Sequence, residues 1–416
     1  MGNMGGPPDA PRRLNQDTGR LAQDIHRAVA WDDAPRRHGA SPTRRFVKGR
    51  LVDQQDTNLL ASASALLQSL LRDPKILAIY VDGTDPIYVQ RGETTTDANA
   101  KFESTAQLMA LVQSLASAAG VTLDERHPSV EFRHTNGLLV AVALPPVSAE
   151  GPSLVIRKPP PSPSPLRKAE EDDVLSRQML TFLEAVLRAP VNVILSGNRG
   201  SDRVTFLSSL LGGIPPAERL ALVEPLMELR IQRPRLLRLQ TGGSELCASP
   251  HSYADVLSIA SRLRVDRIVA SELPAAAFVA AVDLATEGQT MMTSMHATSP
   301  HDAVLRLEAA LQQARPGMSI GLIRKFVSSG VDLIIQRSRL PDGSRRIVSI
   351  AQVGIENNEF LVEEIFVFKI TGMQRGRIMG AYEPTGIMPR VESLLSSLGI
   401  DISQRLFKIG AIGDSF

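Results

Sequence analysis

Apolar and polar positions between residues 59 and 158 follow the periods of short helices and strands. Helical spacing predicts helices over 59–71 and 102–119, the second closed by Gly120. Shorter apolar runs predict strands over 76–81, 87–90, 130–134, 138–144 and 153–157. Asp82-Gly83 and Asn136-Gly137 stand between successive strands, as hairpin turns do. This pattern predicts a compact α+β domain.

From residue 174 onward, helix and strand alternate regularly. The predicted helices cover 176–188, 204–211, 252–263, 275–286 and 300–313. The predicted strands cover 192–196, 220–224, 236–240, 267–270, 290–296, 331–337, 345–353 and 360–368. Such alternation is typical of a mainly parallel sheet covered by helices. Pro341-Asp342-Gly343 predicts a hairpin between two of the later strands, and a helical tail is predicted from 390–398 onward.

Two segments lack this periodicity and mark the domain boundaries. Residues 1–55 are rich in Gly, Pro, Arg and Asp, which predicts a flexible basic leader: either a solvated tail or a contact for anionic lipid or an acidic partner. Residues 159–173 combine a proline–serine run with a charged run and predict an extended linker. The predicted organisation is a leader (1–55), an N-terminal α+β domain (56–158), a linker (159–173), an α/β domain (174–370) and a C-terminal helical tail (371–416).

Composition excludes several classes of protein. The chain has 46 basic and 44 acidic residues and a net charge of +2, so bulk charge gives no reason to expect a nucleic-acid partner. The single cysteine, Cys247, rules out an intramolecular disulfide framework and suits a reducing compartment, where we expect a buried structural thiol. No apolar run approaches the roughly 18 residues of a membrane span. We therefore expect a soluble, cytoplasmic protein.

Residues 193–205 carry the strongest indication of chemistry. A buried strand, a glycine-bearing turn and a helix form the setting of a P-loop, in which backbone N–H groups hold phosphates. The usual pattern G-x-x-x-x-G-K-[ST] begins here at Gly197, but its last three positions hold Asp202, Arg203 and Val204. Aspartate brings a negative charge toward an anion, arginine is not equivalent to lysine, and valine cannot bind magnesium. The pattern alone leaves a nucleotide site and an ordinary strand–turn–helix both open.

Three further polar residues stand at or just after the ends of predicted strands: Glu224, Glu272 and His296. The carboxyl ends of parallel strands line the ligand crevice of an α/β sheet, so we expect these residues near the glycine turn. A carboxylate there can position water or a metal ion. Each glutamate taken alone can equally be a hydrogen-bonded structural group, and a lone histidine is more often structural, but the convergence of these residues with Gly197 favours a functional site. The sequence has no Cys/His cluster, so we predict no zinc site.

Several segments resemble, in the same order along the chain, those of the secretion ATPases of type II and type IV systems. Within these, the sequence looks most similar to the tight-adherence (Tad) pilus branch. The resemblance spans 59–407 and is carried by 147–158, 192–205, 222–229, 264–272, 293–308, 331–346, 386–389 and 399–407. It implies an α/β fold with a RecA-like P-loop NTPase domain preceded by a smaller α+β N-terminal domain. It also implies ATP and Mg²⁺ as cofactors and a hexameric ring at the cytoplasmic side of the inner membrane, in contact with platform proteins of a pilus or secretion system.

The resemblance assigns roles where residues match the family's motifs. Glu272 matches the Walker B glutamate that polarises water, Glu224 the glutamate of the acidic "Asp box", and His296 the histidine of the "His box". Arg157 matches the arginine before the interdomain linker, and Arg267 the arginine entering the Walker B strand. The predicted nucleotide-contacting residues are Gly197, Gly200, Ser201, Arg203, Thr205, Arg157 and Arg267. No metal ligand is assigned.

Departures from the family pattern affect several functions at once. Besides the changed loop, the family's arginines after Walker B and in the N-terminal hairpin are replaced by Pro274 and Leu139, and the acidic box reads Glu224-Pro225. We therefore predict a Tad-type pilus or secretion ATPase homologue with weak or lost ATP hydrolysis. It would act as a pseudo-ATPase scaffold or regulator in a homo-hexamer or in a hetero-ring with a catalytic homologue. The alternatives are an active motor that uses Arg203 and Glu272, and a nucleotide-binding sensor without turnover.

Overall fold

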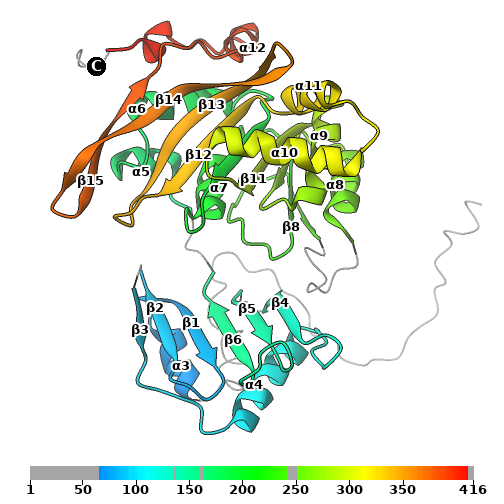
Figure 1. Cartoon of the computed structure of the whole chain (residues 1–416), viewed down its shortest axis with the longest axis vertical. Coiled ribbons are helices and arrows are strands. Elements are labelled where there is room, and N and C mark those ends of the chain that lie inside the picture. Colours follow the sequence, from blue (N-terminus) through cyan, green and yellow to red (C-terminus); the bar gives the residue numbers. More distant parts are fainter. Residues whose placement is uncertain (1–64, 93, 135–136, 160–162, 242–250, 411–416) are drawn as a thin grey trace, which may run out of the picture. The chain divides into compact units, whose positions relative to one another are not determined.

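The computed structural model describes residues 65–410 except for 93, 135–136, 160–162 and 242–250. All of these residues belong to a single unit, Val52–Phe416, which contains two separate sheets (Figure 1). No helix in the described part of the chain is long and apolar enough to cross a membrane. Cys247 and the predicted leader lie outside the described residues.

The N-terminal sheet has six strands in the order β3-β2-β1-β6-β5-β4, and each neighbouring pair is antiparallel. Helix α4 begins after Ser104, whose side chain accepts a hydrogen bond from the N–H of Gln107. Helices and inner strand positions share one apolar core. The elements are α3 (Ala65–Arg72), β1 (Ile76–Asp82), β2 (Tyr88–Arg91), β3 (Thr94–Asp97), α4 (Thr105–Ala118), β4 (Ser129–Arg133), β5 (Leu139–Ala143) and β6 (Ser153–Arg157).

The second sheet has nine strands in the order β15-β14-β13-β12-β7-β11-β10-β8-β9. Strands β12, β7, β11, β10, β8 and β9 are parallel to one another, whereas β12 to β15 pair antiparallel. The strands are β7 (Val193–Gly197), β8 (Leu220–Glu224), β9 (Leu236–Gln240), β10 (Arg267–Ala270), β11 (Thr290–His296), β12 (Leu333–Arg339), β13 (Arg345–Glu356), β14 (Glu359–Gln374) and β15 (Arg377–Pro384).

Helices cover both faces of this sheet. Alternate residues of β7 point to different cores: Val193 and Leu195 pack with α6, α7 and the C-terminal elements, whereas Ile194 packs with α8 to α11. The helices are α5 (Leu166–Glu171), α6 (Arg177–Val186), α7 (Arg203–Leu211), α8 (Tyr253–Arg262), α9 (Ala275–Thr286), α10 (Pro300–Ala314), α11 (Ile320–Gly330), α12 (Glu392–Ser397) and the 3₁₀ helix η1 (Gln404–Phe407). The carboxyl ends of β7, β10 and β11 therefore meet at one edge, where the loops that follow them converge.

The predicted parallel sheet is confirmed, and six elements have the predicted bounds: β6, β8, β9, β10, α9 and β11. The antiparallel pairing of β4 with β5 is also as predicted, although residues 135–136 of its turn lie outside the described residues. The bounds of the parallel strands β8 and β10 were predictable because full burial leaves an almost continuous apolar run in the sequence.

Four elements were not predicted. Helix α11 begins after Ser319. It contains two glycines, and Ile323 and Val327 in its middle are β-branched, so its helix propensity is low. Packing of Ile323 and Val327 in the core stabilises this helix. Strand β3 is fully exposed and shows no apolar alternation. Helix α5 interrupts the predicted extended linker, because 166–171 are good helix formers after Pro165. Strand β15 and the end of β14 occupy 371–384, so the predicted helical tail is wrong there, and α12 follows only at Glu392.

Candidate functional site

Strand β7 leads into a tight loop and then into α7. A Cβ at Gly197 would lie 2.3 Å from the carbonyl oxygen of Arg337 and 2.6 Å from the Ser201 hydroxyl, so no larger residue fits without movement. Gly200 has φ +79°, in the left-handed region that favours glycine. The loop therefore has two positions where glycine is required, and both were identified from the sequence.

Asp202 holds the position directly before α7. Its φ and ψ are 58° and 49°, the left-handed conformation, and its side chain makes no capping hydrogen bond to the helix. Its carbonyl oxygen accepts a hydrogen bond from Arg337 at 2.6 Å, while its carboxylate lies 3.9 Å from the same guanidinium. Burial lowers the pKa of Arg337 to about 10, and the charge of Asp202 acts in the opposite direction. An aspartate thus brings a Cβ and a negative charge to the backbone geometry of a glycine.

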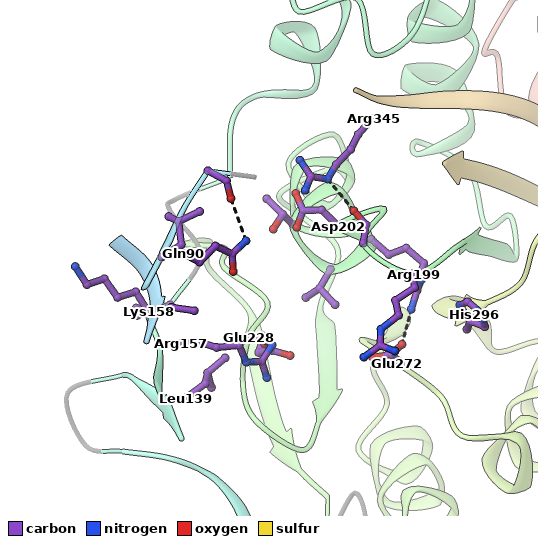
Figure 2. A pocket seen from close by; sticks show the side chains of 18 residues that line it. Gln90, Leu139, Arg157, Lys158, Arg199, Asp202, Glu228, Glu272, His296 and Arg345 are labelled. Carbon is purple, nitrogen blue, oxygen red and sulfur yellow. Dashed lines mark hydrogen bonds and ion pairs between the residues drawn. The ribbon is translucent and has the colours of Figure 1, made fainter. Parts of the chain in front are cut away.

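Arg203, at the first position of α7, folds back over the loop. Its Nη1 donates to the carbonyl oxygens of Gly197 at 2.8 Å and Asn198 at 3.0 Å, and lies 3.4 Å from the Ser201 hydroxyl. Its Nη2 donates to Glu272 Oε1 at 2.5 Å, the contact drawn at Glu272 in Figure 2. Only 11% of the Arg203 side chain is exposed, against 56% for Glu272. Both terminal nitrogens of Arg203 are therefore engaged by groups of the chain itself.

The β12–β13 hairpin also holds the loop. Asn198 exchanges two hydrogen bonds with the backbone of Arg339, at 2.9 and 3.1 Å. Arg345 donates through Nε to the carbonyl oxygen of Gly200 at 2.8 Å. Together with Arg203 and Arg337, these contacts engage the carbonyl oxygens of Gly197, Asn198, Gly200 and Asp202. Hydrogen bonds from arginine side chains therefore hold the backbone of the loop in place.

A pocket of about 960 Å³ opens at this loop and the start of α7 (Figure 2). Its lining carries five basic residues, Arg157, Lys158, Arg199, Arg203 and Arg345. It also carries three acidic residues, Asp202, Glu228 and Glu272, together with His296. The surplus of positive charge beside a helix N-terminus suits an anion such as a phosphate. The pocket can therefore hold an anionic ligand.

The structure brings some of the predicted site residues to this pocket and places others elsewhere. Arg157, Gly200, Arg203, Thr205, Glu272 and His296 line it. Gly197 and Ser201 belong to the loop but are not among the lining residues, and Ser201 is fully buried. Glu224 and Arg267, predicted as a catalytic and a nucleotide-contacting residue, are not among the lining residues.

Glu224 points into the protein. It is 1% exposed, accepts a hydrogen bond from the N–H of Leu229 at 2.8 Å and lies 3.3 Å from Arg238 Nη1. Burial raises the pKa of Glu224 to about 7, an effect that the Leu229 hydrogen bond and the charge of Arg238 only partly oppose. This carboxyl orders the turn after β8.

Arg267 begins β10 and so lies at the opposite end of the strand from the loop that carries Glu272. It is 1% exposed, forms an ion pair with Glu218 at 3.0 Å and donates to the carbonyl oxygens of Leu187 and Ala189. These contacts connect the strand to the end of α6, which is a structural function.

Magnesium does not fit the described residues of this site. Val204 stands where the P-loop pattern has a hydroxyl, and the described part of the chain contains no group of three or more His, Cys, Asp or Glu placed to hold a metal ion. Glu272 has one carboxylate oxygen bound to Arg203. Nucleotide phosphates fit better, because Lys158 and Arg199 line the pocket and Arg199 makes no hydrogen bond or ion pair with another described residue.

Sequence reasoning did not identify the arginines that hold the loop from the β12–β13 hairpin. Arg337, Arg339 and Arg345 lie around Pro341-Asp342-Gly343, which predicted a hairpin but not its position over the loop. The occurrence of these three arginines within nine residues was the feature of the sequence that could have indicated their role. Lys158 and Glu228 were likewise not predicted to line the pocket.

Comparisons with known proteins point in one direction. The family model described as "Type II/IV secretion system protein" matches residues 61–362. A Mycobacterium tuberculosis (strain H37Rv) protein named for conjugal transfer is 26% identical over 315 residues, which cover 71% of this chain and 88% of that protein. The type IV secretion system protein VirB11 of Bartonella quintana is 19% identical over 321 residues, covering 68% of this chain and 90% of VirB11.

Among solved structures, the pilus retraction motor PilT with bound ADP matches with a TM-score of 0.52 at 17% identity. The match covers 72% of this chain and 83% of that chain. At this identity the match concerns the fold alone. It confirms the predicted mixed α/β fold with an N-terminal domain and a core of the secretion-ATPase type.

Proposed function

The chain belongs to the type II/IV secretion system protein family, and from this premise we propose that it is a Tad-type pilus or secretion ATPase homologue that has weak or no ATP hydrolysis. It acts as a pseudo-ATPase, a scaffold or regulator whose loop keeps the family's strand–turn–helix frame.

The observation that carries this proposal is the arrangement of Arg203. At the position of the P-loop lysine, its two terminal nitrogens bind the loop's own carbonyl oxygens and Glu272. A phosphate would have to displace these contacts before Arg203 could bind it, and Glu272 has only one carboxylate oxygen left to orient a water molecule. The missing hydroxyl at Val204 also removes a magnesium ligand. Loss of transition-state charge stabilisation at such positions costs several orders of magnitude in rate.

A second candidate, nucleotide binding without turnover, has one observation in its favour. Five basic residues line the pocket, and Arg199, which makes no hydrogen bond or ion pair with another described residue, remains available to phosphate after Arg203 is engaged. In this case the bound nucleotide would set a conformation and would not be consumed. When bound, ATP would supply a negatively charged polyphosphate group, and Arg157, Lys158 and Arg199 would orient it.

The proposal also includes the oligomeric state of the protein and its location in the cell. We place the protein in a hexameric ring, alone or mixed with a catalytic homologue, on the cytoplasmic side of the inner membrane and against platform proteins of a pilus or secretion system. The support is its family membership and the names of its relatives, which include conjugal transfer and type IV secretion proteins.

The test is ATP hydrolysis by the purified full chain, together with a calorimetric titration with ATP in the presence and absence of magnesium. The pseudo-ATPase is expected to show background turnover that does not change in Glu272→Gln. Turnover that disappears in Glu272→Gln would refute it and establish a working motor. Binding without turnover, equal with and without magnesium, would establish the sensor.

A further inference from the structure

The β14–β15 hairpin forms the outer edge of the nine-stranded sheet (Figure 1). Every residue from 369 to 377 is exposed. The N–H of Ile378 donates to the Asp342 carboxylate at 2.8 Å, in the turn between β12 and β13. The hairpin is thus attached at Ile378, and the tip beyond this residue projects into solvent.

The tip is a two-residue turn with an unusual occupant. Gln374 pairs with Arg377, and the two residues between them, Arg375 and Gly376, have φ of +51° and +77°. This is the type I′ pattern, which favours glycine, asparagine or aspartate at both positions. A long cationic side chain therefore stands at the tip despite an unfavourable backbone conformation, which points to a role for its charge.

One face of the hairpin is apolar as far as the tip. Directly paired residues of antiparallel strands share a face, and the pairs are Phe368 with Tyr382 and Met373 with Ile378. Ile370 lies on this same face, because the residue it pairs with in β15 lies there. The register of β14 shifts between Ile370 and the tip. Ile370 is 56% and Met373 64% exposed, so the apolar row continues from covered residues into solvent.

The tip also carries positive charge without compensation. Residues 370–379 include Arg375 and Arg377 and no acidic residue. Neither arginine forms an ion pair with another described residue. Lys369 lies nearby but is paired with Glu383 at 2.6 Å. Exposed apolar side chains next to unpaired arginines match the composition of surfaces that bind anionic lipid.

We propose that the tip of the β14–β15 hairpin docks on an anionic lipid bilayer. Ile370 and Met373 insert at the boundary between headgroups and acyl chains, while Arg375 and Arg377 bind lipid phosphates. A protein partner fits less well, because a specific protein interface needs about 800 Å² on each side, more than a tip of nine residues provides. Addition of a strand to the β15 edge is opposed by the hydrogen bond between Ile378 and Asp342. The inference deepens the membrane location in the proposed function and does not depend on whether ATP is hydrolysed.

The experiment is co-sedimentation of the full chain with vesicles of phosphatidylglycerol and phosphatidylcholine in equal parts, compared with pure phosphatidylcholine. The variants are Arg375→Ser with Arg377→Ser, and Ile370→Ser with Met373→Ser. Because an arginine at an anionic surface contributes about fivefold to binding, the charge variant is expected to bind about thirtyfold more weakly. The apolar variant is expected to lose at least tenfold.

A matched control changes an exposed apolar and an exposed basic residue on α8, Ile259→Ser with Arg262→Ser. It is expected to bind like the parent. All four substituted tip residues are exposed, so unchanged thermal unfolding should show that the variants remain folded. An independent measurement uses tryptophan fluorescence. The only tryptophan of the sequence is removed by Trp31→Phe and a new one is introduced at the tip by Met373→Trp. The emission of the introduced tryptophan should shift to the blue when anionic vesicles are added.

Equal vesicle binding by the parent and both tip variants would overturn the proposal and move any lipid contact to another part of the chain. No binding by the parent would overturn it as well. Dissociation of a parent oligomer by the tip substitutions, with no vesicle binding, would show that a second copy of the chain occupies the tip instead. All of these outcomes are separate from the nucleotide titration, so either proposal can fail alone.

Discussion

Replacement of Arg203 provides a direct measure of how far the loop depends on its own arginine. We predict that Arg203→Met lowers the stability of the folded protein. In a P-loop whose lysine serves the ligand, removal of the charge would cost ligand affinity. Here it removes two hydrogen bonds to backbone carbonyl oxygens, a longer one to the Ser201 hydroxyl, and one ion pair.

The magnitude follows from the partners that remain. The carbonyl oxygen of Gly197 still accepts from the N–H of Ala297 at 3.2 Å, and that of Asn198 from the N–H of Ser201 at 3.2 Å. Neither carbonyl is left without a partner, so each lost bond costs about 1 kcal/mol. Glu272 is more than half exposed and contributes about 0.5 kcal/mol at most. The sum is about 2.5 kcal/mol at most, or a fall in Tm of about 3 °C for a unit of this size.

The assay is thermal unfolding followed by circular dichroism, with Arg199→Met as the matched control. Arg199 lies in the same loop, is exposed and has no hydrogen bond within the described chain, so its replacement should change stability by less than about 0.5 kcal/mol. Glu272→Gln should also have a small effect. Equal Tm values for Arg203→Met and Arg199→Met would refute the structural role of Arg203 and, with it, the main support for a closed loop.

Three further predictions concern the interior, the loop and assembly. The pKa of Glu224 rises from 4.5 to about 7 on folding, so the folded protein holds a proton that the unfolded chain releases between these values. The contribution of Glu224 to stability is therefore fully present below pH 4.5 and falls by roughly 3 kcal/mol as pH rises to about 7; thermal unfolding across this range should show that the parent loses more stability than Glu224→Gln. Asp202→Gly, Arg203→Lys and Val204→Thr together should restore magnesium-dependent ATP binding in a calorimetric titration; equal lack of binding in the parent and the triple variant would mean that the pocket itself is closed. Light scattering at micromolar concentration should show self-association or a mixed ring with a catalytic homologue, and a monomer under both conditions would contradict the ring.

The sequence predicted the frame of the site because burial dictates it. Strand β7 and helix α7 appear as an apolar run, a glycine turn and a second apolar run, and the strands beside them are equally apolar. Glu272 and His296 were predicted at the pocket for a simple reason: they stand at or just after the carboxyl ends of β10 and β11. Position along a parallel strand therefore predicts closeness to the pocket.

Position alone does not predict the direction of a side chain. Glu224 also ends a strand, but it lies on the same face of that strand as Leu220 and Leu222, which pack into the core under α6 and α7. The turn after β8 then returns over it and supplies the N–H of Leu229, while Arg238 comes from the neighbouring strand β9. The same strand period places Glu224 on an inner face, but its partners come from segments whose positions only the tertiary fold determines.

The pairing of Arg203 with Glu272 joins residues 69 positions apart, and no local pattern encodes it. It also changes how Glu272 should be interpreted. An arginine has five N–H donors in a rigid plane, so it can bind loop carbonyls and a carboxylate at once, whereas a lysine offers a single flexible point charge. A lysine at this position would offer its charge to a ligand, whereas Arg203 binds the carbonyl oxygens of its own loop and Glu272. The presence of the glutamate alone is therefore no argument for hydrolysis, because one of its carboxylate oxygens is already bound to Arg203.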